Sequence, residues 1–148
     1  MDGGESASAR RIAITEGPWA GWNYLSGDAF EDHVGPFYFR RDEVGLTRTG
    51  FIAEPRHMNG LGTMHGGCVL SFADYSLFMI AQNAYPGMAG VTVSLNGEFV
   101  SAIQLGARVE GTGEVVKAGK SLVFTRGTIL ADGAPALTFS GVFKRLRG

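Results

Sequence analysis

The chain has 148 residues and a mass of 15.7 kDa, which allows one hydrophobic core and leaves too little sequence for a second ordinary domain. With 45% hydrophobic residues, 18% charged residues and a formal net charge of −1, it has a globular composition and lacks the basic balance that binding to nucleic acid or to an anionic membrane requires. Its one cysteine, Cys68, can form neither an intramolecular disulfide nor by itself a zinc site, so we expect a cytoplasmic protein. Glycines, an Asp and two Asn interrupt the apolar stretch at residues 60–97, so we expect no membrane span.

The first 30 residues differ in character from the rest of the chain. They show no regular hydrophobic period and contain Ser, Gly and Pro. We therefore expect residues 1–30 to be a loosely ordered lead-in and residues 31–148 to form the domain. Trp19 and Trp22 are expected to pin the end of this lead-in onto the body of the protein.

Residues 36–52 predict a β-hairpin. Phe37, Phe39 and Ile52 alternate with polar residues on either side of Asp42-Glu43-Val44-Gly45, a segment typical of a turn. The alternation has the period of two that a strand with one buried face requires.

Residues 66–84 predict one long buried helix, because apolar side chains recur on almost all of its faces and Pro86-Gly87 follows it. Four segments with strand character come next, at residues 90–100, 106–117, 121–131 and 136–146, and they predict an antiparallel meander. Strands with a single helix on one face give an α+β architecture. Because one helix covers only part of a curled sheet, we expect copies of the chain to associate through sheet edges or faces.

Asp74 is the only charged residue between His57 and Gly97, a stretch of 41 residues in which the chain average would give about seven. A carboxylate in apolar surroundings is costly unless it is hydrogen-bonded, and such a group suits work as a general base or nucleophile. The alternative is that Asp74 lies on an exposed or interface strip of the helix, together with Ser71, Tyr75 and Gln82.

A glycine-rich loop, residues 59–67, leads into the start of this helix. Unpaired backbone N–H groups at a helix start can stabilise the oxyanion that forms on a carbonyl, although an ordinary turn would also use these glycines. His65 suits either polarising a carbonyl or capping the helix. Cys68 lacks a histidine partner at a suitable spacing, and Ser71 lacks the G-x-S-x-G elbow, so neither is expected to be a nucleophile.

The segment HMNGLGTMHGG at residues 57–67, followed seven residues later by Asp74, resembles the signature of hotdog-fold thioesterases. It is most similar to the phenylacetic-acid-degradation branch of that family. The segments GVTVSLN at residues 90–96 and KAGKSLVF at residues 117–124 match later parts of the same pattern, and the resemblance runs from about residue 36 to 146.

The resemblance implies a hotdog fold, an antiparallel β-sheet wrapped around one long central helix, and a homotetramer built as a dimer of dimers with each active site shared across a dimer interface. By position in this sequence it implies that Asp74 is the general base or nucleophile and that the Gly66 backbone N–H polarises the thioester carbonyl. Asn59 would orient the carbonyl or the attacking water, with His65 beside it, and the Thr92 hydroxyl would position water.

The resemblance also implies a substrate, an acyl-CoA. Lys117, Lys120 and Ser121 fall where the coenzyme A phosphates are commonly held, although a solvated hairpin turn would have the same composition. Ser94 departs from the acidic residue that we expect at its position, which leaves a second carboxylate in doubt. No metal or separate cofactor is expected, because coenzyme A is part of the substrate.

The function that follows is hydrolysis of a small, medium-chain or aryl acyl-CoA to the free acid and coenzyme A. Two alternatives stay open. One is a hotdog protein that binds acyl-CoA or lipid without catalysis, for which a desolvated carboxylate such as Asp74 would bring little benefit. The other is a dehydratase or hydratase of acyl thioesters, which usually pairs a histidine with its acid in a different arrangement from His65 and Asp74.

Overall fold

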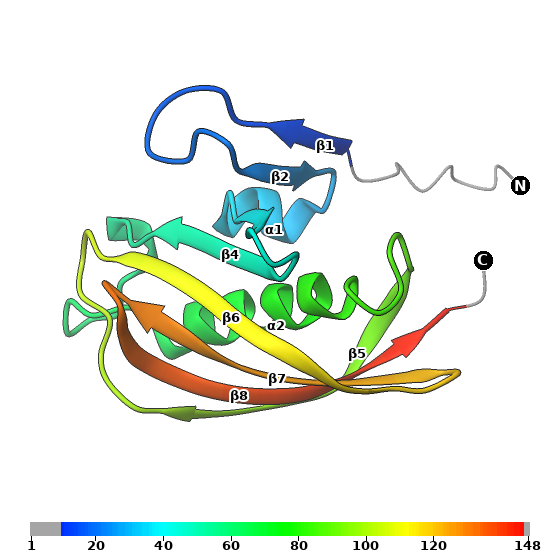
Figure 1. The fold of residues 1–148 in the computed structure, drawn as a ribbon. Helices are drawn as coiled ribbons and strands as arrows, with labels where there is room; N and C mark the ends of the chain where they lie inside the picture. Colours follow the sequence, from blue (N-terminus) through cyan, green and yellow to red (C-terminus); the bar gives the residue numbers. More distant parts are fainter. Residues whose placement is uncertain (1–9, 147–148) are drawn as a thin grey trace, which may run out of the picture.

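The fold is a curled antiparallel sheet wrapped around one central helix, in a computed structural model that describes residues 10–146 (Figure 1). The elements in chain order are β1 (Arg10–Ala13), β2 (Asn23–Ser26), α1 (Ala29–Val34), β3 (Tyr38–Arg41), β4 (Thr47–Ile52), the short 3₁₀ helix η1 (Pro55–His57), α2 (Gly66–Ala81), β5 (Gly90–Phe99), β6 (Arg108–Ala118), β7 (Leu122–Ala131) and β8 (Ala134–Arg145). The predicted α+β hotdog architecture is thereby confirmed.

The sheet has the strand order β1-β2-β3-β4-β6-β7-β8-β5. The hairpin predicted for residues 36–52 is β3–β4, closed by hydrogen bonds between Asp42 and Leu46. The meander, however, comprises only β6, β7 and β8, because β6 pairs with β4 and β5 pairs with β8 at the far edge. The prediction of a four-strand meander was wrong in this respect. Residues 100–107 carry the chain across from β5 to β6, tied to the glycine-rich loop by the bond from Met64 N to Ile103 O.

Helix α2 is buried on most sides, as its sequence predicted. Phe72, Leu77 and Ile80 have no exposed surface. The helix approaches the sheet so closely that the Ser76 hydroxyl lies 2.7 Å from the Thr49 hydroxyl. A Cβ added at Gly111 would lie 2.2 Å from the same Thr49 oxygen, so only glycine fits there. The helix ends at Ala81, three residues before the predicted end, where its regular hydrogen bonds give way to tight turns.

The N-terminal segment is more structured than the sequence predicted. Residues 10–26 form the β1–β2 hairpin, which extends the sheet beyond β3, instead of the loosely ordered lead-in that was expected. Trp19 and Trp22 are buried as predicted, and the ring of Trp19 stacks on Tyr38 at 4.8 Å. The burial of these aromatic side chains therefore stabilises a hairpin whose sequence shows no hydrophobic period. Residues 1–9 lie outside the described residues, and the domain boundary at residue 30 stays a prediction.

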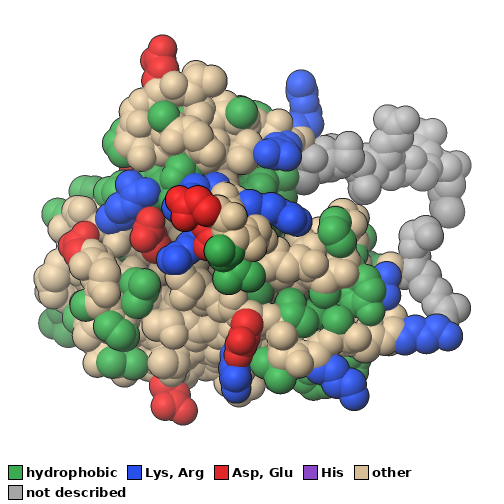
Figure 2. Space-filling model, in the orientation of Figure 1, with side chains coloured by type: hydrophobic (Ala, Val, Ile, Leu, Met, Phe, Trp, Pro, Cys, Tyr) green, Lys and Arg blue, Asp and Glu red, His purple; other side chains and the backbone are tan. Residues whose placement is uncertain are grey.

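The surface charge is mixed in sign. Figure 2 shows lysine and arginine side chains interspersed with acidic ones across the middle of one face, beneath the N-terminal hairpin. Within residues 10–146, no helix is long and apolar enough to cross a membrane.

Candidate active site

Asp74 lies half-buried in the middle of α2 and is hydrogen-bonded to Thr92 on β5. The Thr92 hydroxyl donates to Asp74 Oδ1 over 2.6 Å. Thr92 is paired with Phe143 on β8, and because paired residues share a face of the sheet, the buried Phe143 places Thr92 on the side of the helix. The sequence predicted a hydroxyl that positions water; in the structure this hydroxyl contacts the carboxylate itself.

The Asp74 Oδ2 atom has no hydrogen-bond partner within residues 10–146. One carboxylate oxygen is thus held by a strong, charge-assisted hydrogen bond, and the other is available to water or substrate. The hydrogen bond from Thr92 therefore orients the carboxylate and leaves its second oxygen without a partner among the described residues.

The glycine-rich loop is shaped by Asn59. Its Oδ1 accepts hydrogen bonds from the Leu61 and Thr63 N–H groups at 2.9 and 3.2 Å, and its Nδ2 donates to the Thr63 hydroxyl at 3.1 Å. In a single chain, Asn59 therefore fixes the loop that precedes α2.

His65 caps α2. Its Nδ1 accepts a hydrogen bond from the Gly67 N–H at 2.9 Å, which is the capping role left open by the sequence. Gly66, the first helical residue, donates no backbone hydrogen bond within residues 10–146. The Gly66 N–H is therefore a free donor at the positive end of the helix dipole.

Gly66 and Asp74 do not meet within one chain. Asp74 follows Gly66 by eight positions in the helix, a rise of about 12 Å along the axis. A carbonyl group in contact with the Gly66 N–H of one chain is therefore out of reach of the Asp74 carboxylate in the same chain.

Glu31 is a second carboxyl near Asp74 that the sequence did not reveal. It comes from α1, and burial raises its pKa from 4.5 to about 7, with further contributions from the negative charges of Asp28, Asp74 and Asp32. Its side chain forms no ion pair within residues 10–146. In sequence it is one of several acidic residues in a short polar segment, and nothing in that segment indicates proximity to a residue 43 positions later.

The residues predicted to hold coenzyme A phosphates lie at the end of β6 and on the turn that leads to β7. Lys117, Lys120 and Ser121 are all exposed. The turn is fixed to the body, because Gly119 O accepts the Tyr85 hydroxyl at 2.8 Å and Lys120 O accepts Arg145 Nη1 at 3.1 Å. The two lysines thus stand on an anchored turn at the C-terminal end of α2.

Cys68 is buried and free, and burial raises the pKa of its thiol to about 11. The thiolate is the nucleophilic form of cysteine, so this environment disfavours nucleophilic chemistry. The sequence led to the same expectation. Among residues 10–146 there is also no cluster of three or more side chains suited to holding a metal ion.

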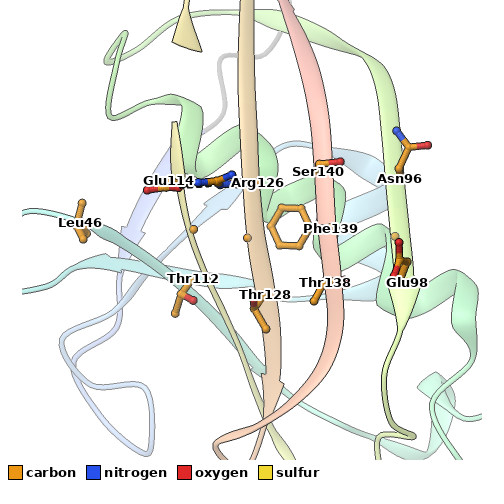
Figure 3. A pocket seen from close by; sticks show the side chains of 13 residues that line it. Leu46, Asn96, Glu98, Thr112, Glu114, Arg126, Thr128, Thr138, Phe139 and Ser140 are labelled. Atoms are coloured by element: carbon orange, nitrogen blue, oxygen red, sulfur yellow. Dashed lines mark hydrogen bonds and ion pairs between the residues drawn. The ribbon is translucent and has the colours of Figure 1, made fainter. Parts of the chain in front are cut away.

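Two cavities of about 870 Å³ each lie on opposite sides of the sheet. One is on the outer face, crossed by an ion pair between Glu114 and Arg126 at 2.6 Å, and Figure 3 shows α2 behind the strands that form it. It is therefore separated from Asp74 by the sheet. The other lies on the helix side, between the N-terminal hairpin and the C-terminal end of α2, with Phe78 and Gln82 in its wall.

Comparison with known proteins places the chain in a family. The thioesterase superfamily matches residues 61–135, which include Gly66, Asp74, Thr92 and both lysines of the β6–β7 turn. The chain belongs to this superfamily, and the resemblance to hotdog thioesterases inferred from the sequence is confirmed.

Individual relatives match only part of the chain. The chain is 32% identical to mouse acyl-coenzyme A thioesterase 13 over 88 residues, 54% of this chain and 63% of the mouse protein. Against the human protein of the same name the identity is 36% over 72 residues, 49% of this chain and 51% of the human protein. The chain thus matches about half to two thirds of the length of these relatives.

A solved structure with the same fold is the E. coli PaaI protein of the phenylacetic acid degradation operon. It has a TM-score of 0.72 and 23% identity, covering 82% of this chain and 86% of PaaI.

Proposed function

We propose that the chain is an acyl-CoA thioesterase in which Asp74 activates the attacking water or attacks the thioester itself. The observation that carries this proposal is the Asp74 carboxylate, with Oδ1 held by the Thr92 hydroxyl and Oδ2 free. In the overall reaction, an oxygen of water forms the new bond to the acyl carbon, the carbon–sulfur bond breaks, and the proton ends on coenzyme A thiol. Curated relatives named acyl-coenzyme A thioesterase support this reaction for the chain.

The proposed site needs two copies of the chain. The Gly66 N–H and the Asp74 carboxylate are about 12 Å apart along one helix. The thioester carbonyl on which Asp74 of one copy acts is therefore polarised by the Gly66 N–H of a second copy. The edge strand β5, which carries Thr92, suits such pairing, since no strand among residues 10–146 pairs with its outer edge and Val91 and Val93 are 48% and 53% exposed. This reasoning supports the homo-oligomer predicted from the sequence, whose dimer-of-dimers arrangement stays a prediction.

Replacement of Asp74 by Asn tests the chemistry, because it keeps the shape of the side chain and removes its basicity. We expect kcat for thiol release from an acyl-CoA to fall about 10²-fold to 10⁴-fold, with a much smaller change in KM. Asp132→Asn is the matched control, since Asp132 lies in the β7–β8 turn and accepts a bond from the Arg108 N–H. A folded Asp74→Asn protein with the turnover of the control would remove Asp74 from the mechanism.

The same assay separates the alternatives. A binding protein would retain acyl-CoA and release no thiol, whereas a hydratase would add water to an enoyl-CoA and leave the thioester intact.

A mixing experiment tests the shared site. Gly66→Pro removes the N–H at the first helical position, where proline fits a helix, and Gly66→Ala keeps the N–H as its control. Co-refolding inactive Asp74→Asn and Gly66→Pro chains should restore about a quarter of the wild-type sites, because half of the randomly paired dimers hold one intact site of two. No recovery from a mixture that forms hybrid dimers would contradict the two-chain site.

Coenzyme A is proposed to contact Lys117 and Lys120 through its phosphates. Changing both to Ala should raise KM for an acyl-CoA and leave KM for the matching acyl-pantetheine nearly unchanged, because the pantetheine substrate lacks the nucleotide phosphates. Equal losses on the two substrates would mean that the turn has only a structural role.

A further inference from the structure

One wall of the helix-side cavity is built by a part of the chain that the family match does not include. Its walls come from β1, β2 and β3 on one side, and from the C-terminal half of α2 with residues 86–89 on the other. Leu25, Phe39, Phe78 and Met88 give it an apolar surface. In Figure 1 the β1–β2 hairpin lies above the helices.

Three arginines line this cavity; the guanidinium of Arg40 lies over the ring of Trp22 at 5.2 Å, which leaves Arg11 and Arg41. Arg41 is paired with Thr47, whose hydroxyl contacts Asn83 after α2, so this face of β3 looks toward the helix. Arg11 Nε donates to Asn23 Oδ1 at 3.1 Å, and its guanidinium lies 5.9 Å from the ring of Phe39 on the same face. Because Asn23 is itself buried, it holds Arg11 in a fixed position at the cavity wall.

The arginines retain free hydrogen-bond donors. Within residues 10–146, neither Arg11 nor Arg41 forms an ion pair, and the cavity lining contains no Asp or Glu. The amide of Gln82 is already engaged, since it donates to Met88 O and accepts from the Gly87 N–H. The hydrogen-bond donors that remain free in the cavity are thus guanidinium N–H groups, which can bind an anion through several hydrogen bonds.

The cavity begins one helical turn from Asp74. Phe78 and Gln82 follow Asp74 on the same side of α2, about 6 and 12 Å along its axis. An acyl chain whose thioester carbon lies at Asp74 can therefore run along this side of the helix, past apolar walls, and end near the two arginines.

We propose that this cavity binds an acyl group that ends in a carboxylate, so that the preferred substrates are coenzyme A monothioesters of medium-length dicarboxylic acids. The inference rests on the proposed thioesterase function. The apolar walls contact the methylene chain, and Arg11 and Arg41 bind the distal carboxylate. The N-terminal hairpin is then the element that determines acyl specificity.

Chain-matched substrates test this proposal. Adipoyl-, suberoyl- and sebacoyl-CoA are compared with hexanoyl-, octanoyl- and decanoyl-CoA, and suberoyl-CoA also with its distal methyl ester, which removes only the negative charge. We expect kcat/KM to be about 10-fold to 100-fold higher for the best dicarboxylic substrate than for its neutral partners, as hydrogen bonds to a charged group would give. This comparison uses the wild-type protein and does not depend on any variant folding.

Arginine variants assign the effect to the cavity. Arg11→Gln and Arg41→Gln should each remove most of the preference and leave octanoyl-CoA turnover unchanged. Arg48→Gln is the matched control, because Arg48 lies on neighbouring β4 and is paired with Asp42 at 3.5 Å. Thermal melting of each variant shows whether the hairpin remains folded.

Three outcomes would overturn the inference. Equal turnover of dicarboxylic and neutral substrates would leave the thioesterase proposal intact and remove the carboxylate specificity. Arginine variants that raise KM for every acyl-CoA, but for no acyl-pantetheine, would show that the arginines hold coenzyme A phosphates instead. Failure to hydrolyse any acyl-CoA in the panel would refute the proposed function, and the inference with it.

Discussion

The attachment of the N-terminal hairpin depends on Trp19, and this dependence can be tested by changing Trp19 to Ala. The backbone connection is slight, because β2 and β3 share one residue pair, Asn23 with Phe39, whereas β3 and β4 share four. Trp19 is only 5% exposed, stacks on Tyr38, and lies under the guanidinium of Arg108 at 4.0 Å. The side-chain cluster therefore supplies most of the free energy that docks the hairpin.

Removal of a buried tryptophan side chain costs about 3–5 kcal/mol. Because 1.36 kcal/mol corresponds to a factor of ten, the undocked population of the hairpin should rise by about two to four orders of magnitude. Hydrogen exchange followed by mass spectrometry should show faster exchange over residues 10–26, with the protection of α2 and β6–β8 little changed. Trp19→Phe keeps an aromatic ring over Tyr38 and should show an intermediate effect.

A functional readout accompanies this change. If the cavity arginines select the acyl group, Trp19→Ala should lose the preference for suberoyl-CoA over octanoyl-CoA while it retains octanoyl-CoA turnover. Cooperative melting of the whole protein at a much lower temperature, with exchange increased everywhere, would refute the view that the hairpin is a separable unit.

Three further predictions concern single side chains. Thr92→Val should lower kcat by at least about tenfold, because it removes a hydrogen bond to a charged group, while Thr92→Ser should retain most activity; equal kcat values in the two variants would exclude a role for the hydroxyl. The pKa of Glu31 is raised to about 7, so the stability that its protonated form contributes is complete below about pH 4.5 and is lost as the pH rises through 7. The Tm of Glu31→Gln relative to wild type should therefore increase between these pH values, and a constant difference would contradict the assignment. Cys68 should resist a thiol reagent in the native protein at pH 8 and react fully in denaturant, because burial raises its pKa to about 11.

Much of this fold could be predicted because local patterns and long-range packing agree in it. The apolar faces of residues 66–84 predicted the buried helix, and the alternation around Asp42-Glu43-Val44-Gly45 predicted the β3–β4 hairpin. The glycine-rich loop and the isolated Asp74 predicted a candidate active site, which stays a prediction. In each case the signal is carried by residues close together in the chain.

The parts that could not be predicted depend on contacts between distant segments. Strand period does not determine which neighbour a strand selects, so the pairing of β5 with β8 was missed. Glu31 lies near Asp74 only because α1 folds back over α2, and Arg11 reaches the cavity only because Trp19 and Trp22 dock the hairpin.

The structure also distinguishes Asp74 from the polar residues that share its strip of α2. The Ser71 hydroxyl donates to Gly67 O, the Tyr75 hydroxyl to Phe37 O, and the Gln82 amide braces the following loop, so each has a partner within the fold. Asp74 has one oxygen on Thr92 and one without a partner in residues 10–146. Because Asp74 is only half-buried, this second oxygen is accessible to water or substrate.

The free oxygen fits two chemical roles, and isotopically labelled water separates them. In a single turnover, a general base would direct the label straight into the product acid. A nucleophilic Asp74 would form an anhydride with the acyl group. Where water then attacks the carbonyl of Asp74, the label enters the Asp74 carboxylate and the first product molecule carries an unlabelled oxygen. Label in the protein after one turnover, and in the product only after several, would therefore identify Asp74 as the nucleophile.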